Sequence, residues 1–124
     1  MDTEEYLYVY FSIIGKAAEL YPTSSQEVVY KLSLNDNEFN RIVRKVGEGR
    51  MTQQLRQLFI ELTEGGIFRG VVTKQETIIS AVTPLGYSII EQSKKTNFWE
   101  NIKKSTPKWA VNSLTSFLIA YLTK

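Results

Sequence analysis

The sequence contains no cysteine and no histidine, and each absence removes a class of chemistry. Without cysteine the chain can form no disulfide, no thiolate nucleophile and no cysteine metal site. Without histidine it lacks the histidine-based catalytic triads, the usual zinc ligands and the side chain that most readily titrates near neutral pH. Triad hydrolases and histidine- or cysteine-based zinc enzymes are therefore excluded.

Other catalytic motifs are missing as well. Gly65-Gly66 precedes an expected strand and not a helix, so it does not form a phosphate-binding loop. Asn35–Glu38 shares residues with a calcium loop but lacks its glycine and its distal glutamate, and we interpret it as a helix cap. The thirteen carboxylates are scattered, and spacing places no pair at one site. We therefore expect no enzyme activity, no metal and no cofactor.

Strong charge and a long hydrophobic run are also lacking. The net charge of +2 is too weak by itself to indicate a nucleic-acid-binding protein. The apolar segment Trp109–Thr123 is shorter than the roughly 17 residues that a membrane-spanning helix needs at least, so we expect no span. The acidic start, Met1–Glu5, is unlike a secretory signal, and we expect a cytoplasmic protein.

What the chain does contain is enough apolar sequence for one folded domain with a core, because 43% of its 124 residues are apolar and 23% are charged. Capping residues followed by apolar residues at helical spacing predict four helices in the first half. They begin at Asp2 or Thr3, at Ser24 or Ser25, within Asn35–Glu38, and at Arg50 or Met51. Pro22 ends the first helix, the second is expected over Thr23–Lys31, and the fourth ends near Thr63.

A β-hairpin is predicted next. The segments Ile67–Val72 and Thr77–Val82 are rich in β-branched residues, and the polar residues Thr73–Glu76 separate them. Thr83 then caps a helix with Pro84 in its first position. Helix, hairpin, T-P-x-G and helix form the outline of a winged helix. We predict an α+β, mainly helical winged helix-turn-helix domain with a two-stranded hairpin as its wing and an apolar C-terminal helix.

Residues 1–96 are expected to form the winged-helix domain and residues 97–124 a C-terminal helical extension. Its segments are Asn97–Lys104 and Trp109–Lys124. The last helix is apolar on nearly all sides and must bury more than one face. It can pack on the first helix or pair the first and last helices of two chains. We favour the homodimer, with association at a membrane surface as a third choice. The expected dimer-interface residues are Trp109, Leu114, Phe117, Leu118 and Tyr121.

Basic residues concentrate between Arg41 and Gln57. This segment holds five basic residues and one acid, Glu48, and so carries a net charge of +4, against +2 for the whole chain. Arginine and glutamine can make bidentate contacts with base edges in the major groove, and basic side chains neutralise phosphates. The same residue types are good helix formers on any solvated face, so an ordinary surface helix is the competing interpretation.

In a winged helix, the helix before the hairpin is the recognition helix, so the predicted DNA-binding residues lie on it and around it. The residues expected to read bases are Arg50, Gln53, Gln54 and Gln57. The residues expected to hold phosphates are Arg41, Arg44, Lys45, Arg56, Arg69 and Lys74, and Gln75 at the hairpin tip is expected to reach the backbone or the minor groove. Double-stranded DNA is therefore the expected partner.

Two stretches in the second half carry a family resemblance. Val82–Ile90, followed by Asn97–Lys104 and an apolar tail, resembles the small, uncharacterised winged-helix proteins of Gram-positive phages, prophages and plasmids. Leu62–Ile67 is similar to the start of the strand that follows the recognition helix in winged-helix regulators. The resemblance implies a regulator of transcription or replication in a phage or mobile element. The alternative is a phage-encoded module that inhibits or recruits a host or defence protein.

The chain departs from this pattern before the recognition helix. Arg41–Thr52 looks like an extra turn or helix inserted there. Two helices, Asn37–Val46 and Met51–Thr63, are therefore both candidates to enter a groove of DNA.

Overall fold

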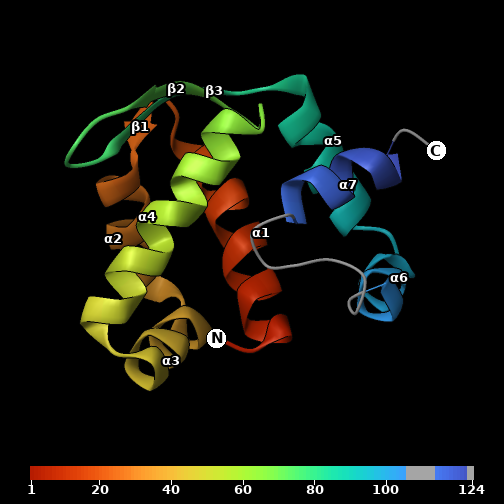
Figure 1. Ribbon diagram of the computed structural model, residues 1–124, viewed down its shortest axis with the longest axis horizontal. Coiled ribbons are helices and arrows are strands. Elements are labelled where there is room, and N and C mark those ends of the chain that lie inside the picture. Colours follow the sequence, from red (N-terminus) through yellow and green to blue (C-terminus); the bar gives the residue numbers. More distant parts are fainter. Residues whose placement is uncertain (106–113, 123–124) are drawn as a thin grey trace.

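The computed structural model describes residues 1–105 and 114–122, which form a mainly helical α+β fold with one small antiparallel sheet (Figure 1). In chain order the elements are α1 (Thr3–Leu20), β1 (Thr23–Ser24), α2 (Ser25–Asn35), α3 (Asn37–Val46), α4 (Glu48–Glu64), β2 (Phe68–Val72), β3 (Thr77–Val82), α5 (Pro84–Ser93), α6 (Phe98–Ser105) and α7 (Leu114–Leu122). The sheet lies at one end of the molecule. α1 runs through the middle, with α2 and α4 on one side and α5 to α7 on the other (Figure 1).

Helix starts follow the local capping chemistry. The side chain of Asp2 accepts the backbone N–H of Glu5 while the Glu5 carboxylate accepts that of Asp2, which completes a capping box. Ser24 and Asp36 cap α2 and α3, and Thr83 caps α5. The predicted caps are therefore confirmed, with Asp2 and Ser24 as the capping residues where the sequence left two choices.

Two helix boundaries differ from the prediction. α4 begins at Glu48 and not at Arg50 or Met51. The chain turns between α3 and α4 at Gly47 alone, whose φ of 96° favours glycine. Gly49 lies within α4 and does not break the helix. α2 runs from Ser25 to Asn35, longer than the predicted Thr23–Lys31, and Thr23 lies in a strand.

The sheet has three strands, one more than predicted, in the order β1-β3-β2. β2 and β3 form the predicted hairpin, with Val71 opposite Ile78 and a bulge between Arg69 and Gly70. The turn is held by the backbone N–H of Thr73, which donates to the carbonyl oxygen of Glu76 at 2.8 Å. β1 was missed because two residues carry no strand pattern of their own. They become a strand only by pairing with Ile78 and Ile79 of β3.

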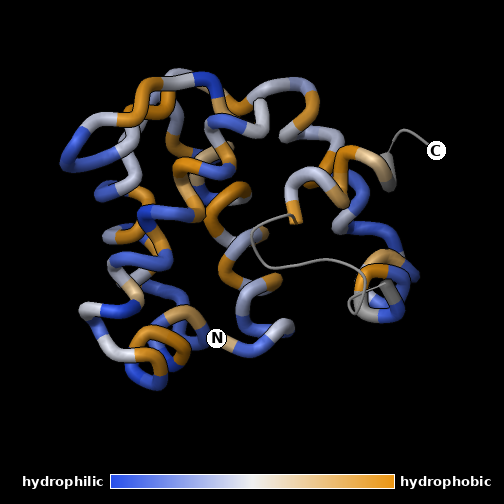
Figure 2. Tube along the Cα trace, viewed as in Figure 1, coloured by the Kyte–Doolittle hydropathy of each residue, from blue (hydrophilic) through white to orange (hydrophobic). Residues whose placement is uncertain are grey.

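The core is built around α1. Val9, Tyr10, Ile13, Ile14 and Ala17 are fully buried, and they belong to one hydrophobic cluster that includes residues of every described helix and of β2 and β3. Hydrophobic residues follow the central helix, whereas the hairpin tip is hydrophilic (Figure 2). The described part of the predicted C-terminal extension therefore contributes to the same core as residues 1–96.

α7 packs inside the chain. Leu114 and Leu118 are fully buried, so they are unavailable for the predicted dimer interface, and Phe117 is half-buried. The hydroxyls of Thr115 and Tyr10 are 2.8 Å apart and fix α7 on α1. This arrangement is the packing alternative left open by the sequence. Trp109 and the side chain of Tyr121 lie outside the described residues. None of the described helices is both long and apolar enough to cross a membrane.

Candidate nucleic-acid interface

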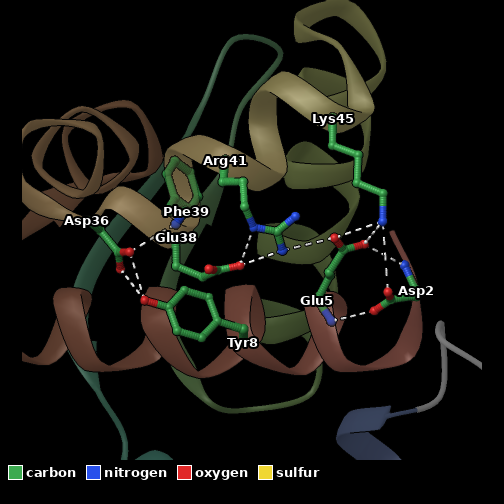
Figure 3. Close-up of polar contacts among 8 residues, drawn as sticks. All are labelled: Asp2, Glu5, Tyr8, Asp36, Glu38, Phe39, Arg41 and Lys45. Atoms are coloured by element: carbon green, nitrogen blue, oxygen red, sulfur yellow. Dashed lines mark hydrogen bonds and ion pairs between the residues drawn. The ribbon is translucent and has the colours of Figure 1, made fainter.

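Two of the predicted phosphate-binding residues of α3 face the first helix. The Arg41 guanidinium lies 3.2 Å and the Lys45 ammonium 3.0 Å from Oε2 of Glu5 (Figure 3). The residue Glu5 is only 5% exposed. Arg41 also pairs with Glu38, and Lys45 lies 3.9 Å from Asp2. Arg41 and Lys45 are therefore occupied in a structural cluster, which we call the Glu5 cluster: Asp2, Glu5, Glu38, Arg41 and Lys45.

The charge of the basic segment is correspondingly smaller than its sequence suggests. The sequence segment contains one acid, but folding adds three carboxylates from outside it, those of Asp2, Glu5 and Glu38. Arg41 and Lys45 thus face three carboxylates, whereas Arg44, Arg50 and Arg56 form no ion pair among the described residues. The backbone N–H of Asp2 and the ammonium of Lys45 hold the pKa of Glu5 at about 2, although burial acts in the opposite direction. The carboxylate therefore stays ionised beside its two cations.

A second polar contact fixes the start of α3. The hydroxyl of Tyr8 donates to the carboxylate of Asp36, with O–O distances of 2.7 and 2.9 Å, and the same carboxylate caps α3 at the backbone N–H of Phe39 (Figure 3). Burial and this hydrogen bond raise the pKa of Tyr8 to about 12. Together with the Glu5 cluster, this contact holds the polar side of α3 against α1.

α4 exposes its predicted residues on two different sides. Gln53, Gln54 and Gln57 line a groove of about 840 Å³ whose opposite wall is α7; Gln54 is half-buried. Glu61 and Glu64 line the same groove, and their carboxylates oppose phosphate binding at that end of α4. The three glutamines predicted to read bases therefore lie together in the structure. The sequence analysis did not predict that Glu61 and Glu64 would line the same groove.

The other side of α4 faces the hairpin. Nη2 of Arg56 donates to the carbonyl oxygen of Thr73 at 3.1 Å, which brings the guanidinium beside the exposed tip residues Lys74 and Gln75. Arg56 also lines a second groove, of about 380 Å³, between α2, α4 and the hairpin. We call it the α2–α4 groove. Its lining residues are Ser25, Gln26, Val29, Tyr30, Thr52, Leu55, Arg56, Phe59, Gln75, Glu76 and Thr77.

The remaining predicted cations are exposed. Within residues 1–105 and 114–122, no ion pair forms at Arg44, Arg50, Arg56, Arg69 or Lys74. The same residues contain no group of three or more histidine, cysteine or carboxylate side chains that could hold a metal ion. The groove beside Arg56 was missed by sequence reasoning because its walls come from three separate elements. No family model, curated protein or solved structure matches the chain.

Proposed function

We propose that the chain is a winged helix-turn-helix protein that binds double-stranded DNA through α4 and the β2–β3 hairpin. The order α1–β1–α2–α4–β2–β3 supports this proposal because it is compatible with a winged helix, if α3 is taken as one additional helix. α3 is held against α1 by the Glu5 cluster, whereas the polar face of α4, with Arg50, Gln53 and Gln57, is exposed, and α4 directly precedes the hairpin. Of the two candidate helices, α4 is therefore the one we assign to a DNA groove.

The hydrogen bond from Arg56 to Thr73 is the observation that carries this proposal. It joins α4 to the hairpin and places the guanidinium of Arg56 at Thr73, the residue before exposed Lys74. Neither cation forms an ion pair among the described residues. An arginine guanidinium has five N–H donors, so this bond leaves others for phosphate oxygens. Cations placed on both elements would let one duplex contact the helix and the wing at once.

The structure changes the expected roles of several residues. We assign phosphate contacts to Arg44, Arg56, Arg69 and Lys74, and base contacts to Arg50, Gln53 and Gln57. Arg41 and Lys45 are removed from the phosphate-binding set because they pair with Glu5. The biological role we infer, from the family resemblance, is control of transcription or replication in a phage or mobile element.

Fluorescence anisotropy of a labelled mixed-sequence duplex tests this proposal. We expect binding that weakens steeply between low and near-physiological salt, because phosphate contacts release counterions. Arg56→Ala and Lys74→Ala should each weaken binding to all duplexes and each lower the salt slope by about one. Lys95→Ala removes an exposed lysine after α5 and is the matched control. Absence of binding at low salt, or an equal loss in the control, would contradict the proposal.

One feature favours a protein-interaction module as the second candidate. Val71 and Ile78 face each other across the hairpin and are 62% and 40% exposed, on the side of the sheet opposite to buried Thr77 and Ile79. With Val72, which is 37% exposed, they form a group of exposed apolar residues on the hairpin, and contiguous exposed apolar surface can mark a protein-binding site. A nuclease-treated pull-down from host lysate, compared between wild type and Val71→Ser, tests it. A stoichiometric partner lost in the variant favours this candidate over DNA binding.

A further inference from the structure

The α2–α4 groove has a preformed shape. Its floor is apolar, since Leu55 and Phe59 of α4 are buried beneath it. Two hydrogen bonds fix its walls: the backbone N–H of Thr77 donates to the hydroxyl of Ser25 at 2.9 Å, and Arg56 donates to the carbonyl of Thr73. α2, α4 and the hairpin are thus tied together around an open apolar slot.

An exposed aromatic ring stands at the edge of this slot. Tyr30 is 59% exposed, and in the described part of the chain its hydroxyl makes no hydrogen bond and its ring stacks on no other ring. Leu34, one turn further along α2, is similarly exposed but does not line the groove. An unpartnered aromatic ring beside an apolar floor is suited to stacking with another planar group.

The rim carries groups that recognise base edges. Gln26 on α2 and Gln75 on the hairpin line the slot and are exposed, and their amides offer both donors and acceptors. Glutamine amides pair with adenine edges, and a carboxylate such as that of Glu76 accepts from the amino group of cytosine. These side chains fit a planar heterocycle better than they fit an aliphatic partner.

The charge around the slot fits the phosphates that accompany a base. Among the described lining residues there is one cation, Arg56, and one carboxylate, Glu76. Just outside the lining, exposed Lys31 follows Tyr30 and exposed Lys74 precedes Gln75, against exposed Glu27 after Gln26, so the cations are in excess by one. Bases inside a duplex are paired and stacked and cannot enter such a slot. We infer that the α2–α4 groove binds an unpaired nucleobase of a single-stranded segment next to the duplex. This inference rests on the DNA-binding function proposed above.

The experiment compares a blunt duplex with the same duplex carrying a short single-stranded overhang, by anisotropy at low salt. Wild type should bind the overhang duplex about tenfold more tightly, the size expected for one base–aromatic stack. Tyr30→Ala should remove this preference and leave blunt-duplex affinity unchanged, whereas Tyr30→Phe should retain it. Leu34→Ala is the matched control, an exposed apolar residue on the same helix outside the groove.

A fluorescent base analogue in the overhang gives an independent readout. Stacking on Tyr30 should quench its emission in wild type and in Tyr30→Phe, and the quenching should disappear in Tyr30→Ala. Equal binding of both duplexes by wild type, or an equal loss for both in Tyr30→Ala, would overturn the inference while the proposed function stands. Failure of wild type to bind either duplex would overturn both.

Discussion

Glu5 shows how one side chain can serve several parts of this fold. Its carboxylate accepts the backbone N–H of Asp2 at the start of α1 and holds both Arg41 and Lys45 of α3. A buried carboxylate is favourable only when its lone pairs are occupied, and here they are. Arg41 and Lys45, which the sequence analysis predicted to bind DNA phosphates, therefore pair with Glu5 and join α3 to α1.

Replacing Glu5 with glutamine keeps the side-chain shape and removes the charge, so Glu5→Gln should lower the free energy of unfolding at neutral pH. The folded-state pKa of Glu5, about 2, lies below its ordinary value of 4.5. The stabilisation is therefore fully present above about pH 4.5 and is lost as the pH falls toward about 2. Urea-unfolding midpoints of both proteins across this range should converge at the acidic end.

Glu19→Gln is the control for this comparison. Glu19 pairs only with Lys16 on the surface of α1 among the described residues, and such exposed pairs contribute little. The variant should unfold like wild type at every pH. A difference between wild type and Glu5→Gln that grows as the pH falls would contradict the assignment of Glu5.

The hairpin depends on the close approach of its two strands at Gly70. A Cβ atom on this residue would lie 1.9 Å from the carbonyl oxygen of Ile78, which is backbone and cannot rotate away. Gly70→Ala should therefore distort the bulge and destabilise the protein by about 1–3 kcal/mol or more. Chemical denaturation measures the change, and a stability equal to that of wild type would show that β2 and β3 can separate at no cost.

Gly15→Ala, in a helix, is expected to raise the stability of the protein, in contrast to Gly70→Ala. Among the described residues, and apart from the adjoining residues and backbone of α1 itself, no heavy atom lies within 4 Å of the added methyl group, and Gly15 is in the interior of α1. The substitution should stabilise the protein by about 0.5–1 kcal/mol, because alanine is the better helix former. Comparing the two variants separates a steric effect from a general effect of glycine replacement.

The sequence predicted the elements that depend on neighbouring residues. The caps at Asp2, Asp36 and Thr83 and the hairpin could be recognised because their determinants lie within a few residues. Elements that depend on contacts between distant residues could not be predicted in this way. β1, for example, exists only through its pairing with Ile78 and Ile79. For the same reason the carboxylates facing Arg41 and Lys45, and the groove beside Tyr30, required the folded chain.

Considered as a whole, the molecule is assembled around α1, which contacts α2, α3, β3 and α5 and receives α7. The Tyr10–Thr115 hydrogen bond is the buried polar link between the two ends of the described chain. Burial raises the pKa of Tyr10, so its hydroxyl remains a neutral donor or acceptor. The position of α7 thus depends on a polar contact as well as on the burial of Leu114 and Leu118.

Thr115→Val should destabilise the protein by about 1–3 kcal/mol, because it leaves the buried hydroxyl of Tyr10 without its partner. Tyr10→Phe should have a comparable cost. The double variant should be more stable than the two separate losses predict, since removing both partners leaves no unsatisfied group. Thermal and urea unfolding of the four proteins complete the cycle, and strictly additive losses would contradict a direct interaction.

The central position of α1 also bears on how the protein is made. The ribosome synthesises Tyr10 well before Thr115, its partner 105 residues later. At translation rates of about 5–20 residues per second, roughly 5–20 seconds separate the two. During that interval the apolar side of α1 has only part of its eventual cover. The nascent chain is therefore expected to be a substrate for chaperones until α7 has emerged, and folding should complete late in synthesis.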